Sequence, residues 1–381
     1  MKKLKTMTVV GTRPEIIKLS RVIAELRQHT EHVLVHTGQN YSDELNEVFF
    51  RDLKIEKPDY YLEAATDNLA QSIGNIIAKA DAVFEKEQPQ AVLFYGDTNS
   101  CLAAIAAKRR KIPLFHMEAG NRCFDQRVPE EINRKIIDHI SDINMPLSEH
   151  ARRYLIAEGL KPETIIKIGS PLQEVYQYHW KDIQASTILD RLHLKAKDYF
   201  IVSAHREENV DKMSYLQQLL STLNTIAETY NKRIIVSTHP RTRARLESFF
   251  DNGKSVQLDP RIEFMTAFGL LDYIKLQLSA FCILSDSGSI TEDASILNIP
   301  AVTIRDAHER PEGMDVGTLV MCGLKAERVM QAIEIVVSHH DQSQRAFALV
   351  PDYEADNVSK KVLRIITSYI DYINQTVWRE Y

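Results

Sequence analysis

Short apolar runs alternate with amphipathic helical stretches along the first half of the chain. Runs typical of buried strands lie at 7–10, 33–36, 91–95, 112–115 and 165–168. After the first run, apolar residues recur at helical spacing at Ile16, Leu19, Val22, Ile23 and Leu26. Because strands that alternate with helices form mainly parallel sheets, this half is predicted to be a doubly wound α/β domain.

The pattern begins again after Gly169-Ser170-Pro171, a segment typical of a hinge. Further strand-like runs lie at 200–203, 234–237, 281–284 and 301–304. A chain of 381 residues exceeds the usual size of a single core. We therefore expect two Rossmann-like domains: residues 1–170 together with 365–381, and residues 171–364. The final stretch, 358–381, has one apolar stripe and is predicted to be a helix that returns to the first domain.

Composition and charge narrow the classes of partner. The net charge is −5, 26% of residues are charged and there is no long basic tract, which argues against nucleic acid. The four cysteines form no CxxC pair and have no matching histidine spacing, so no metal site and no disulfide are expected, and a cytoplasmic location fits. No stretch has the length and apolar character of a membrane span. Neither half has a GxGxxG turn after its first strand, which argues against a nicotinamide cofactor.

Three acidic residues lie at the ends of predicted strands or at the start of a predicted helix. Glu118 lies just past the strand 112–115, Asp97 follows the strand 91–95, and Glu130 lies in the first turn of a helix that begins at Pro129. Carboxyl ends of parallel strands are where α/β folds place ligands, and two acids in one cleft can each handle a proton. The alternative is a solvated helix surface, on which Glu130 pairs with Arg134 and Glu131 with Lys135 at i,i+4 spacing.

Polar and cationic residues at other predicted strand ends suit a diphosphate. The segment 285–293 follows a strand and opens a helix, so Ser287, Gly288 and Ser289 offer N–H groups to an anion; a plain N-cap is the alternative. Four more cations lie at strand ends or in the loop 305–313, namely Arg13, Lys18, His205 and Arg310. A single such residue is more often a surface charge. His239-Pro240-Arg241 is interpreted as packing.

Eight motifs in order along nearly the whole chain resemble those of the non-hydrolysing UDP-N-acetylglucosamine 2-epimerases. They are Gly11-Thr-Arg-Pro-Glu15, Thr37-Gly-Gln-Asn40, Gly96-Asp-Thr98, His116-Met-Glu-Ala-Gly120, Pro129-Glu-Glu-Ile-Asn-Arg134, His205-Arg-Glu-Glu-Asn209, Ser285-Asp-Ser-Gly288 and Glu309-Arg-Pro-Glu312. The resemblance implies two Rossmann-like domains in a GT-B arrangement with an interdomain cleft. It also implies a homodimer that works without metal or other cofactor.

The same resemblance implies a role for each site residue. Asp97, Glu118 and Glu130 would be the acid/base set, with Arg134 orienting Glu130. The diphosphate and the intermediate would be held by His205, Arg13, Lys18, Ser287, Gly288, Ser289 and Arg310. Tyr273 and Asp293 would bind the nucleoside. Epimerisation would proceed by elimination of UDP and its return after a proton is delivered to the opposite face of C2.

Three segments indicate a subgroup of that family. Residues 121–127, 307–309 and 377–379 are most similar to the enzymes that convert UDP-2-acetamido-2,6-dideoxy-L-talose to UDP-N-acetyl-L-fucosamine for capsule or O-antigen (lipopolysaccharide) precursors. We hypothesise that Phe124 or Cys123 lines a pocket for the 6-deoxy methyl group.

Other functions remain open from the sequence. A UDP-N-acetylglucosamine 2-epimerase that forms UDP-N-acetylmannosamine is the alternative within the family. A GT-B glycosyltransferase would use the same fold, a nucleotide-sugar sensor would bind without turnover, and a hydrolysing relative would release free sugar and UDP.

Overall fold

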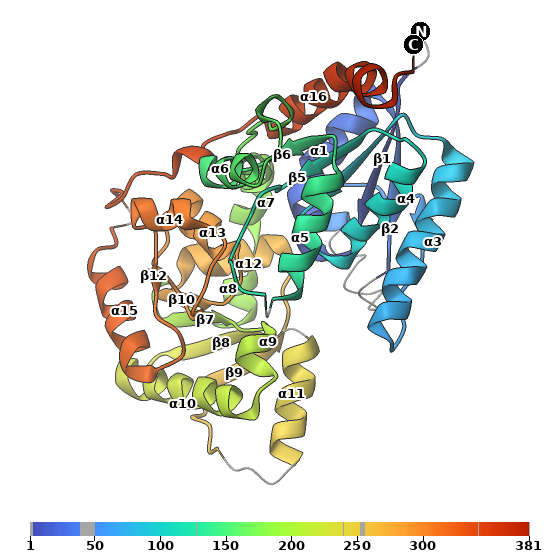
Figure 1. The fold of residues 1–381 in the computed structure, drawn as a ribbon. Coiled ribbons are helices and arrows are strands. Elements are labelled where there is room, and N and C mark those ends of the chain that lie inside the picture. The colour runs from blue at the N-terminus through green and yellow to red at the C-terminus, as the bar shows by residue number, and fades with distance from the viewer. Residues whose placement is uncertain are drawn as a thin grey trace. The chain divides into compact units, whose positions relative to one another are not determined.

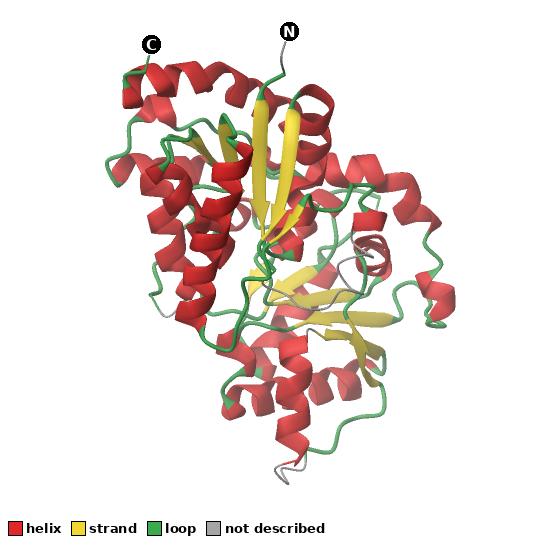
Figure 2. Cartoon of the chain, turned by 90° about the vertical axis from the view of Figure 1, so that its right-hand side faces the viewer, coloured by secondary structure: helices red, strands yellow, loops and turns green. Residues whose placement is uncertain are grey.

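The chain forms two α/β units. In the computed structural model, residues 3–38, 50–126, 128–238, 240–251, 256–341 and 343–380 are described. Unit 1 comprises residues 1–178 and 352–381, and unit 2 comprises residues 179–351 (Figure 1). Figure 2 shows the strands of each unit flanked by helices.

Unit 1 is built on a parallel sheet of six strands in the order β3-β2-β1-β4-β5-β6. The strands are β1 (Lys5–Val10), β2 (Glu31–His36), β3 (Tyr60–Tyr61), β4 (Ala91–Tyr95), β5 (Leu114–Met117) and β6 (Ile143–Met145). All neighbouring pairs are parallel. Alternate residues of β1, Met7 and Val9, pack in one buried cluster with Ala80 and Phe84, because successive side chains of a strand face opposite sides of the sheet.

The helices of unit 1 are α1 (Arg13–His29), α3 (Leu69–Glu87), α4 (Ala104–Arg109), α5 (Pro129–Ile140), α6 (Glu149–Ala157) and α16 (Val358–Ile373), with the short turns η1 (Asn99–Ala103), η2 (Pro162–Thr164) and η4 (Asn374–Trp378). Most of these helices connect the strands, whereas α6 and α16 follow the last strand, β6. Helix α16, near the red end of the colour range, packs on α1. Residues 352–381 belong to unit 1, so the end of the chain packs with the first unit.

Unit 2 repeats the design with a parallel sheet in the order β12-β11-β10-β7-β8-β9. Its strands are β7 (Tyr199–Ser203), β8 (Arg233–Thr238), β9 (Ile262–Thr266), β10 (Cys282–Ser285), β11 (Ala301–Thr303) and β12 (Val320–Met321). Phe200 and Val202 face one core cluster, whereas Tyr199 and Ile201 face another. Both faces of the sheet are therefore covered, as in a doubly wound fold.

The helices of unit 2 are α8 (Ile188–Arg191), α9 (Glu207–Val210), α10 (Met213–Tyr230), α11 (Pro240–Asp251), α12 (Leu270–Ser279), α13 (Ile290–Leu297), α14 (Pro311–Val316) and α15 (Ala326–Ser338). Most of them lie between the strands along the chain, whereas α8 precedes β7 and α15 follows β12. Helix α7 (Leu172–Ala185) and the turn η3 (Pro351–Tyr353) contain the positions where the two units divide. No helix in the described parts of the chain is both long enough and apolar enough to cross a membrane.

Two details differ from the sequence-based expectations. The run 165–168 is not a regular strand: it lies beside β6, with an isolated bridge between Asn144 and Ile165. Four of the described strands were not predicted, namely β3, β6, β9 and β12. The three residues of β6, for example, include the polar Asn144 and so lack a long apolar run. The units divide after residues 178 and 351, whereas the expected boundaries followed 170 and 364. Residue 170 precedes α7, within which the division falls, and residue 364 lies inside α16, which packs on α1.

Candidate functional site

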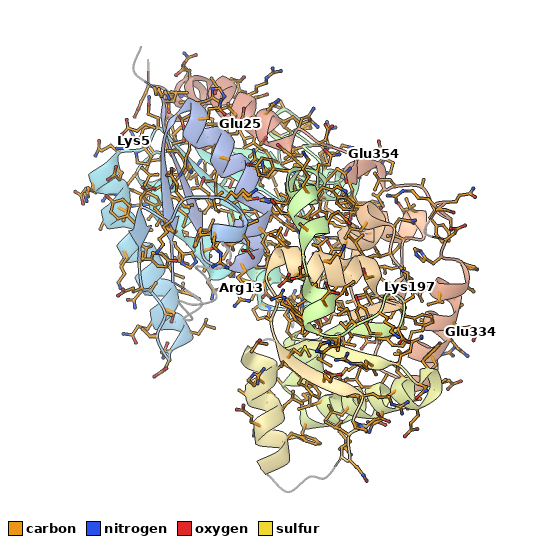
Figure 3. The ribbon with its side chains drawn as sticks, turned by 180° about the vertical axis from the view of Figure 1, so that it is seen from behind. Lys5, Arg13, Glu25, Lys197, Glu334 and Glu354 are labelled. Atoms are coloured by element: carbon orange, nitrogen blue, oxygen red, sulfur yellow. The ribbon has the colours of Figure 1, made fainter. Side chains whose placement is uncertain are left out.

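The carboxyl end of the unit 1 sheet gathers six of the predicted residues. Arg13 opens α1 directly after β1, Asp97 follows β4, and Glu118 follows β5. Figure 3 shows Arg13 at the opposite end of α1 from Glu25. Lys18 lies five residues further along α1, while Glu130 and Arg134 come from α5. Parallel strands end at one edge, so this arrangement follows from the topology.

Glu118 accepts two short hydrogen bonds at this edge. Its Oε2 atom accepts hydrogen bonds from Lys18 Nζ at 2.7 Å and from the Tyr95 hydroxyl at 2.6 Å. Glu118 has a left-handed backbone with φ 61°. Sequence reasoning missed Tyr95, although it is the last residue of β4 and so lies at the same edge.

Asp97 is held by Arg134. Arg134 lies 2.7 Å from Asp97 Oδ2 through Nη2 and donates to the same oxygen from Nε at 3.0 Å. Its Nη1 donates to Glu131 Oε2 at 2.9 Å. Glu131 is buried, with 1% of its surface exposed. The alternative of a solvated Glu131–Lys135 pair is therefore wrong for Glu131, which pairs with Arg134 at i,i+3. Glu130 is half-buried in the first turn of α5.

A buried charge network supports the two loops that carry these acids. His116 Nε2 lies 2.8 Å from the Gly96 carbonyl oxygen, and its Nδ1 lies 2.9 Å from Asp138 Oδ1. Asp138 accepts from Arg122 at 2.8 Å and from the backbone N–H of Gly120 at 3.2 Å. Burial alone would raise the pKa of Asp138, but His116 and Arg122 together lower it.

Gly120 fixes the course of the chain after Glu118. Its φ is +81°, and a Cβ atom at this position would lie 2.4 Å from the Ala151 carbonyl oxygen. Only glycine fits this backbone and this close approach. The loop between Glu118 and Arg122 is therefore locked from both sides, by Gly120 and by Asp138.

Glu15 ties the loop after β1 to the loop that contains Asp97. Its Oε2 accepts from the backbone N–H groups of Gly11 at 2.5 Å and Thr12 at 3.2 Å, and its Oε1 accepts from Thr98 and Ser100. Burial raises the pKa of Glu15 to about 7, and these hydrogen bonds offset only part of the effect.

We predict a pH effect on stability from Glu15. Because its pKa is raised in the folded state, the folded chain keeps a proton that the unfolded chain loses above about pH 4.5. The stability contributed by this group should fall by about 1.4 kcal/mol per pH unit from there to about pH 7. In Glu15→Gln, the free energy of unfolding measured by urea denaturation should no longer fall between about pH 4.5 and pH 7. Glu25→Gln, on the same helix, is the control, and an unchanged slope in Glu15→Gln would contradict the prediction.

In unit 2, a buried aspartate organises the loop after β7. Asp286 accepts from the backbone N–H groups of His205 and Arg206, each at 2.9 Å, and from Asn209 Nδ2 at 3.0 Å. Its Oδ1 lies 3.1 Å from His205 Nδ1. Burial would raise the pKa of Asp286, but the charge of His205 and these hydrogen bonds lower it to about 2.

Ser287, Gly288 and Ser289 precede α13, as predicted. Ser289 occupies the N-cap position, but its side chain makes no capping hydrogen bond; its hydroxyl lies 3.0 Å from that of Ser287. A plain side-chain cap therefore does not explain these residues. With Arg305, His308, Glu309 and Arg310, Ser287 and Gly288 line a small cavity.

The arginines of this cavity have carboxylate partners. Arg305 binds Glu309 through two hydrogen bonds of 2.8 and 3.0 Å. Arg310 Nη2 lies 2.8 Å from the buried Glu292. Glu292 fixes the Arg310 side chain beside Gly288, a contact that the sequence analysis did not predict.

Tyr273 and Asp293 are linked through Gln277. Gln277 Nε2 donates to Asp293 Oδ2 at 3.3 Å. Burial raises the pKa of Tyr273, and hydrogen bonds with Ser203 and Gln277 offset part of that effect. The structure thus places the two predicted nucleoside-binding residues in one set. Gln277 is the member that the sequence analysis missed.

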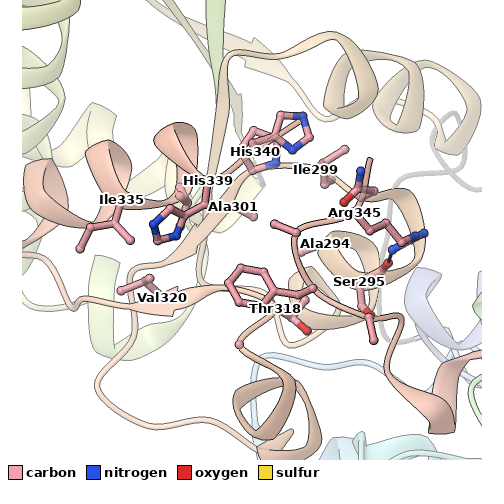
Figure 4. A pocket seen from close by; sticks show the side chains of 17 residues that line it. Ala294, Ser295, Ile299, Ala301, Thr318, Val320, Ile335, His339, His340 and Arg345 are labelled. Atoms are coloured by element: carbon pink, nitrogen blue, oxygen red, sulfur yellow. Dashed lines mark hydrogen bonds between the residues drawn. The ribbon is translucent and has the colours of Figure 1, made fainter. Parts of the chain in front are cut away.

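A second cavity of unit 2, of about 100 Å³, contains none of the predicted site residues (Figure 4). It is lined by Ala301, Thr318 and His339, and by the segment that includes Arg345. Arg345 donates to the carbonyl oxygens of Ser295 and Ile296 at 2.6 and 2.8 Å. These bonds satisfy carbonyl groups at the end of α13, which is a structural role.

Some predicted positions cannot be placed. Gln39, Asn40, Arg127 and His239 lie outside the described residues. Within the described residues, no group of three His, Cys, Asp or Glu side chains is arranged to hold a metal ion.

Comparison with known proteins points to one family. A family model described as UDP-N-acetylglucosamine 2-epimerase matches residues 24–367. The solved UDP-N-acetylglucosamine 2-epimerase of Rickettsia bellii is 62% identical, with a TM-score of 0.91, and the match covers 99% of this chain and 100% of that one. The Methanocaldococcus jannaschii UDP-GlcNAc 2-epimerase, solved with UDP-GlcNAc and UDP, is 34% identical, with a TM-score of 0.88 and coverage of 96% and 100%.

A relative with a different named substrate is also similar. The Pseudomonas aeruginosa UDP-2,3-diacetamido-2,3-dideoxy-D-glucuronate 2-epimerase is 33% identical over 86% of this chain and 91% of its own length. The solved structures confirm the two-domain α/β fold of the GT-B class that the sequence predicts.

Proposed function

The chain belongs to the UDP-N-acetylglucosamine 2-epimerase family and is a UDP-sugar 2-epimerase, an isomerase; we propose that its substrate is UDP-2-acetamido-2,6-dideoxy-L-talose and its product UDP-N-acetyl-L-fucosamine. The observation that supports C2 chemistry is a pair of carboxylates at one sheet edge, each bound by a cationic side chain. Lys18 binds Glu118, and Arg134 binds Asp97. UDP-N-acetylglucosamine is the alternative substrate, and it fits the names of the relatives equally.

The proposed reaction is an elimination followed by re-addition. A base removes the C2 proton while the C1–O bond breaks, and UDP leaves with the bonding electron pair. A C1=C2 double bond results. A second group then delivers a proton to the opposite face of C2, and UDP returns to C1. This route avoids a carbanion that no neighbouring carbonyl would stabilise, but it needs two proton-handling groups and cations at the leaving diphosphate.

We assign the proton-handling roles to Asp97, Glu118 and Glu130. Arg134 and Lys18 keep two of these side chains in place, as their distances of 2.7 Å support. Arg13 lies at the same sheet edge and would offset charge on the diphosphate.

Unit 2 would bind the UDP moiety. Ser287, Gly288 and Ser289 precede α13, whose N-terminus favours an anion. Arg310, fixed by Glu292, would add positive charge, and His205, fixed by Asp286, would contact the diphosphate. Tyr273 and Asp293 would contact the nucleoside, the latter through ribose hydroxyls.

Phe124 is the best candidate for recognition of the 6-deoxy group. It is 70% exposed, has a left-handed φ of 56°, and stacks edge-on against Tyr154 at 5.3 Å. Phe124→Ala should lower kcat/KM for the 6-deoxy sugar about tenfold more than for UDP-N-acetylglucosamine, as expected for the loss of one apolar contact. Phe347→Ala removes another exposed phenylalanine, in unit 2, and is the control. Equal losses for both sugars would contradict this role.

Proton NMR in deuterated water tests the proposed function. The 6-deoxy-L-talo compound and UDP-N-acetylglucosamine are supplied separately, without an acceptor. The epimerase should exchange deuterium into C2 of its substrate and form the second epimer. A glycosyltransferase or a sensor would leave C2 protonated, and a hydrolysing enzyme would accumulate free sugar and UDP. Faster turnover of UDP-N-acetylglucosamine would select the alternative substrate.

The proposal includes a cellular setting. A homodimer in the cytoplasm would supply the nucleotide sugar for capsule or O-antigen synthesis. The family resemblance supports this setting, and light scattering of the purified chain tests the dimer.

A further inference from the structure

Two donors from separate elements meet on one oxygen of Glu118. Lys18 Nζ, from α1, lies 2.7 Å from Oε2, and the Tyr95 hydroxyl, at the end of β4, lies 2.6 Å from the same atom. Both donor residues are buried, with 5% and 3% of their surfaces exposed. Lys18 Nζ also lies 5.5 Å from the centre of the Tyr95 ring. Tyr95 therefore contacts both members of the ion pair.

The other carboxylate oxygen of Glu118 has a different neighbour. Oε1 lies 3.6 Å from the point where a side chain on Gly96 would begin. Glycine at position 96 leaves this space open. Proton transfer at Oε1 would leave both hydrogen bonds to Oε2 in place.

The hydrogen bond from Tyr95 has two physical consequences. It fixes the rotation of the carboxylate, so that Oε1 keeps one direction. It also stabilises the ionised form, because a hydroxyl donates more strongly to a carboxylate than to a neutral carboxyl group. The charged groups on the elements around Glu118 include Arg13, Glu15 and Lys18 on α1, Asp97 after β4, Glu130, Glu131 and Arg134 on α5, and the pair His116 and Asp138 behind the loop.

We propose that Tyr95 is a positioning residue that orients the Glu118 carboxylate through Oε2 and adjusts its strength as a base. This inference rests on the proposed function, since it takes Glu118 to be a proton-transfer group. It adds a residue outside the acid/base set, and its effect differs from that of losing a catalytic acid.

The test is the pH profile of C2 deuterium exchange in Tyr95→Phe. With the hydrogen bond from Tyr95 removed, Glu118 should hold its proton more tightly. The acidic limb of kcat/KM should move up by about one pH unit, a tenfold change in proton affinity, while activity at high pH falls much less. Tyr60→Phe is the matched control. Tyr60 lies on the edge strand β3, and its hydroxyl also donates to a carboxylate, that of Glu87 at the end of α3. Its profile should match that of the unsubstituted chain.

A second variant preserves packing. 3-Fluorotyrosine incorporated at position 95 keeps the ring and is a stronger donor than tyrosine, so the acidic limb should move to lower pH. Shifts in opposite directions for Tyr95→Phe and fluorotyrosine would support the proposal. Profiles that coincide with that of Tyr60→Phe would overturn it.

A readout independent of turnover separates this inference from the proposed function. The Glu118 carboxyl signal is followed by carbon NMR in glutamate-labelled protein and assigned with Glu118→Gln. If the unsubstituted chain shows no C2 exchange, the proposed function fails. If exchange is normal but Tyr95→Phe leaves both the acidic limb and the Glu118 titration unchanged, only the role of Tyr95 fails.

Discussion

Glu118→Gln should lower the rate of C2 deuterium exchange by about a hundredfold or more, the usual cost of losing a general acid or base. The glutamine side chain keeps the size of glutamate but cannot accept a proton at working pH. It can still accept one hydrogen bond from Lys18 or Tyr95, so the loop should keep its course. The measurement is the exchange rate at C2 by proton NMR under saturating UDP-sugar.

Glu63→Gln is a matched control for this substitution. Glu63 also has a left-handed backbone, with φ 46° against 61° for Glu118, but its side chain is exposed. Its exchange rate should be that of the unsubstituted chain. UDP affinity, measured by calorimetry, should change little in Glu118→Gln, because the proposed UDP contacts lie in unit 2 and at Arg13 and do not include Glu118. A near-normal exchange rate in Glu118→Gln would remove this residue from the acid/base set.

Asp138→Ala should lower the free energy of unfolding of unit 1 by about 3–5 kcal/mol, the range observed when one partner of a buried ion pair is removed. Asp138 and Arg122 both have fully buried side chains. The substitution also removes the acceptor for the backbone N–H of Gly120 and the partner of His116. C2 exchange should slow as well, since these contacts hold the loops of Glu118 and Asp97.

Urea denaturation measures this loss. Trp378 lies in unit 1 and Trp180 in unit 2, so a Trp180→Phe background makes the fluorescence report on unit 1. Asp81→Ala is the control: Asp81 also binds an arginine, Arg110, but its side chain is 42% exposed, and exposed ion pairs contribute little. Equal effects of the two substitutions would contradict a special role for the buried network.

The pH dependence of the same network has a definite sign. Because the pKa of Asp138 is lowered in the folded state, its contribution to stability is complete above the unfolded value of 3.8 and is lost as the pH falls below it. Asp138→Ala should therefore flatten the acid limb of the stability curve of unit 1.

The sequence by itself determined the fold class and the family. Apolar runs separated by helical spacing predict parallel strands, because only strands covered on both faces are apolar throughout. The same logic placed Asp97 and Glu118 at strand ends, where the structure has them. Motif order along the chain identified the family, since these motifs mark the loops that follow the strands.

Only the tertiary structure decided which side chains meet. Helical spacing allows Arg134 to pair with Glu130 or Glu131, and the burial of α5 brings Glu131 and Asp97 to Arg134. The contact between Tyr95 and Glu118 joins residues 23 positions apart, a separation that carries no periodic signal. Local pattern fixes which face of an element is apolar, whereas the identity of a buried polar partner depends on the packing of distant segments.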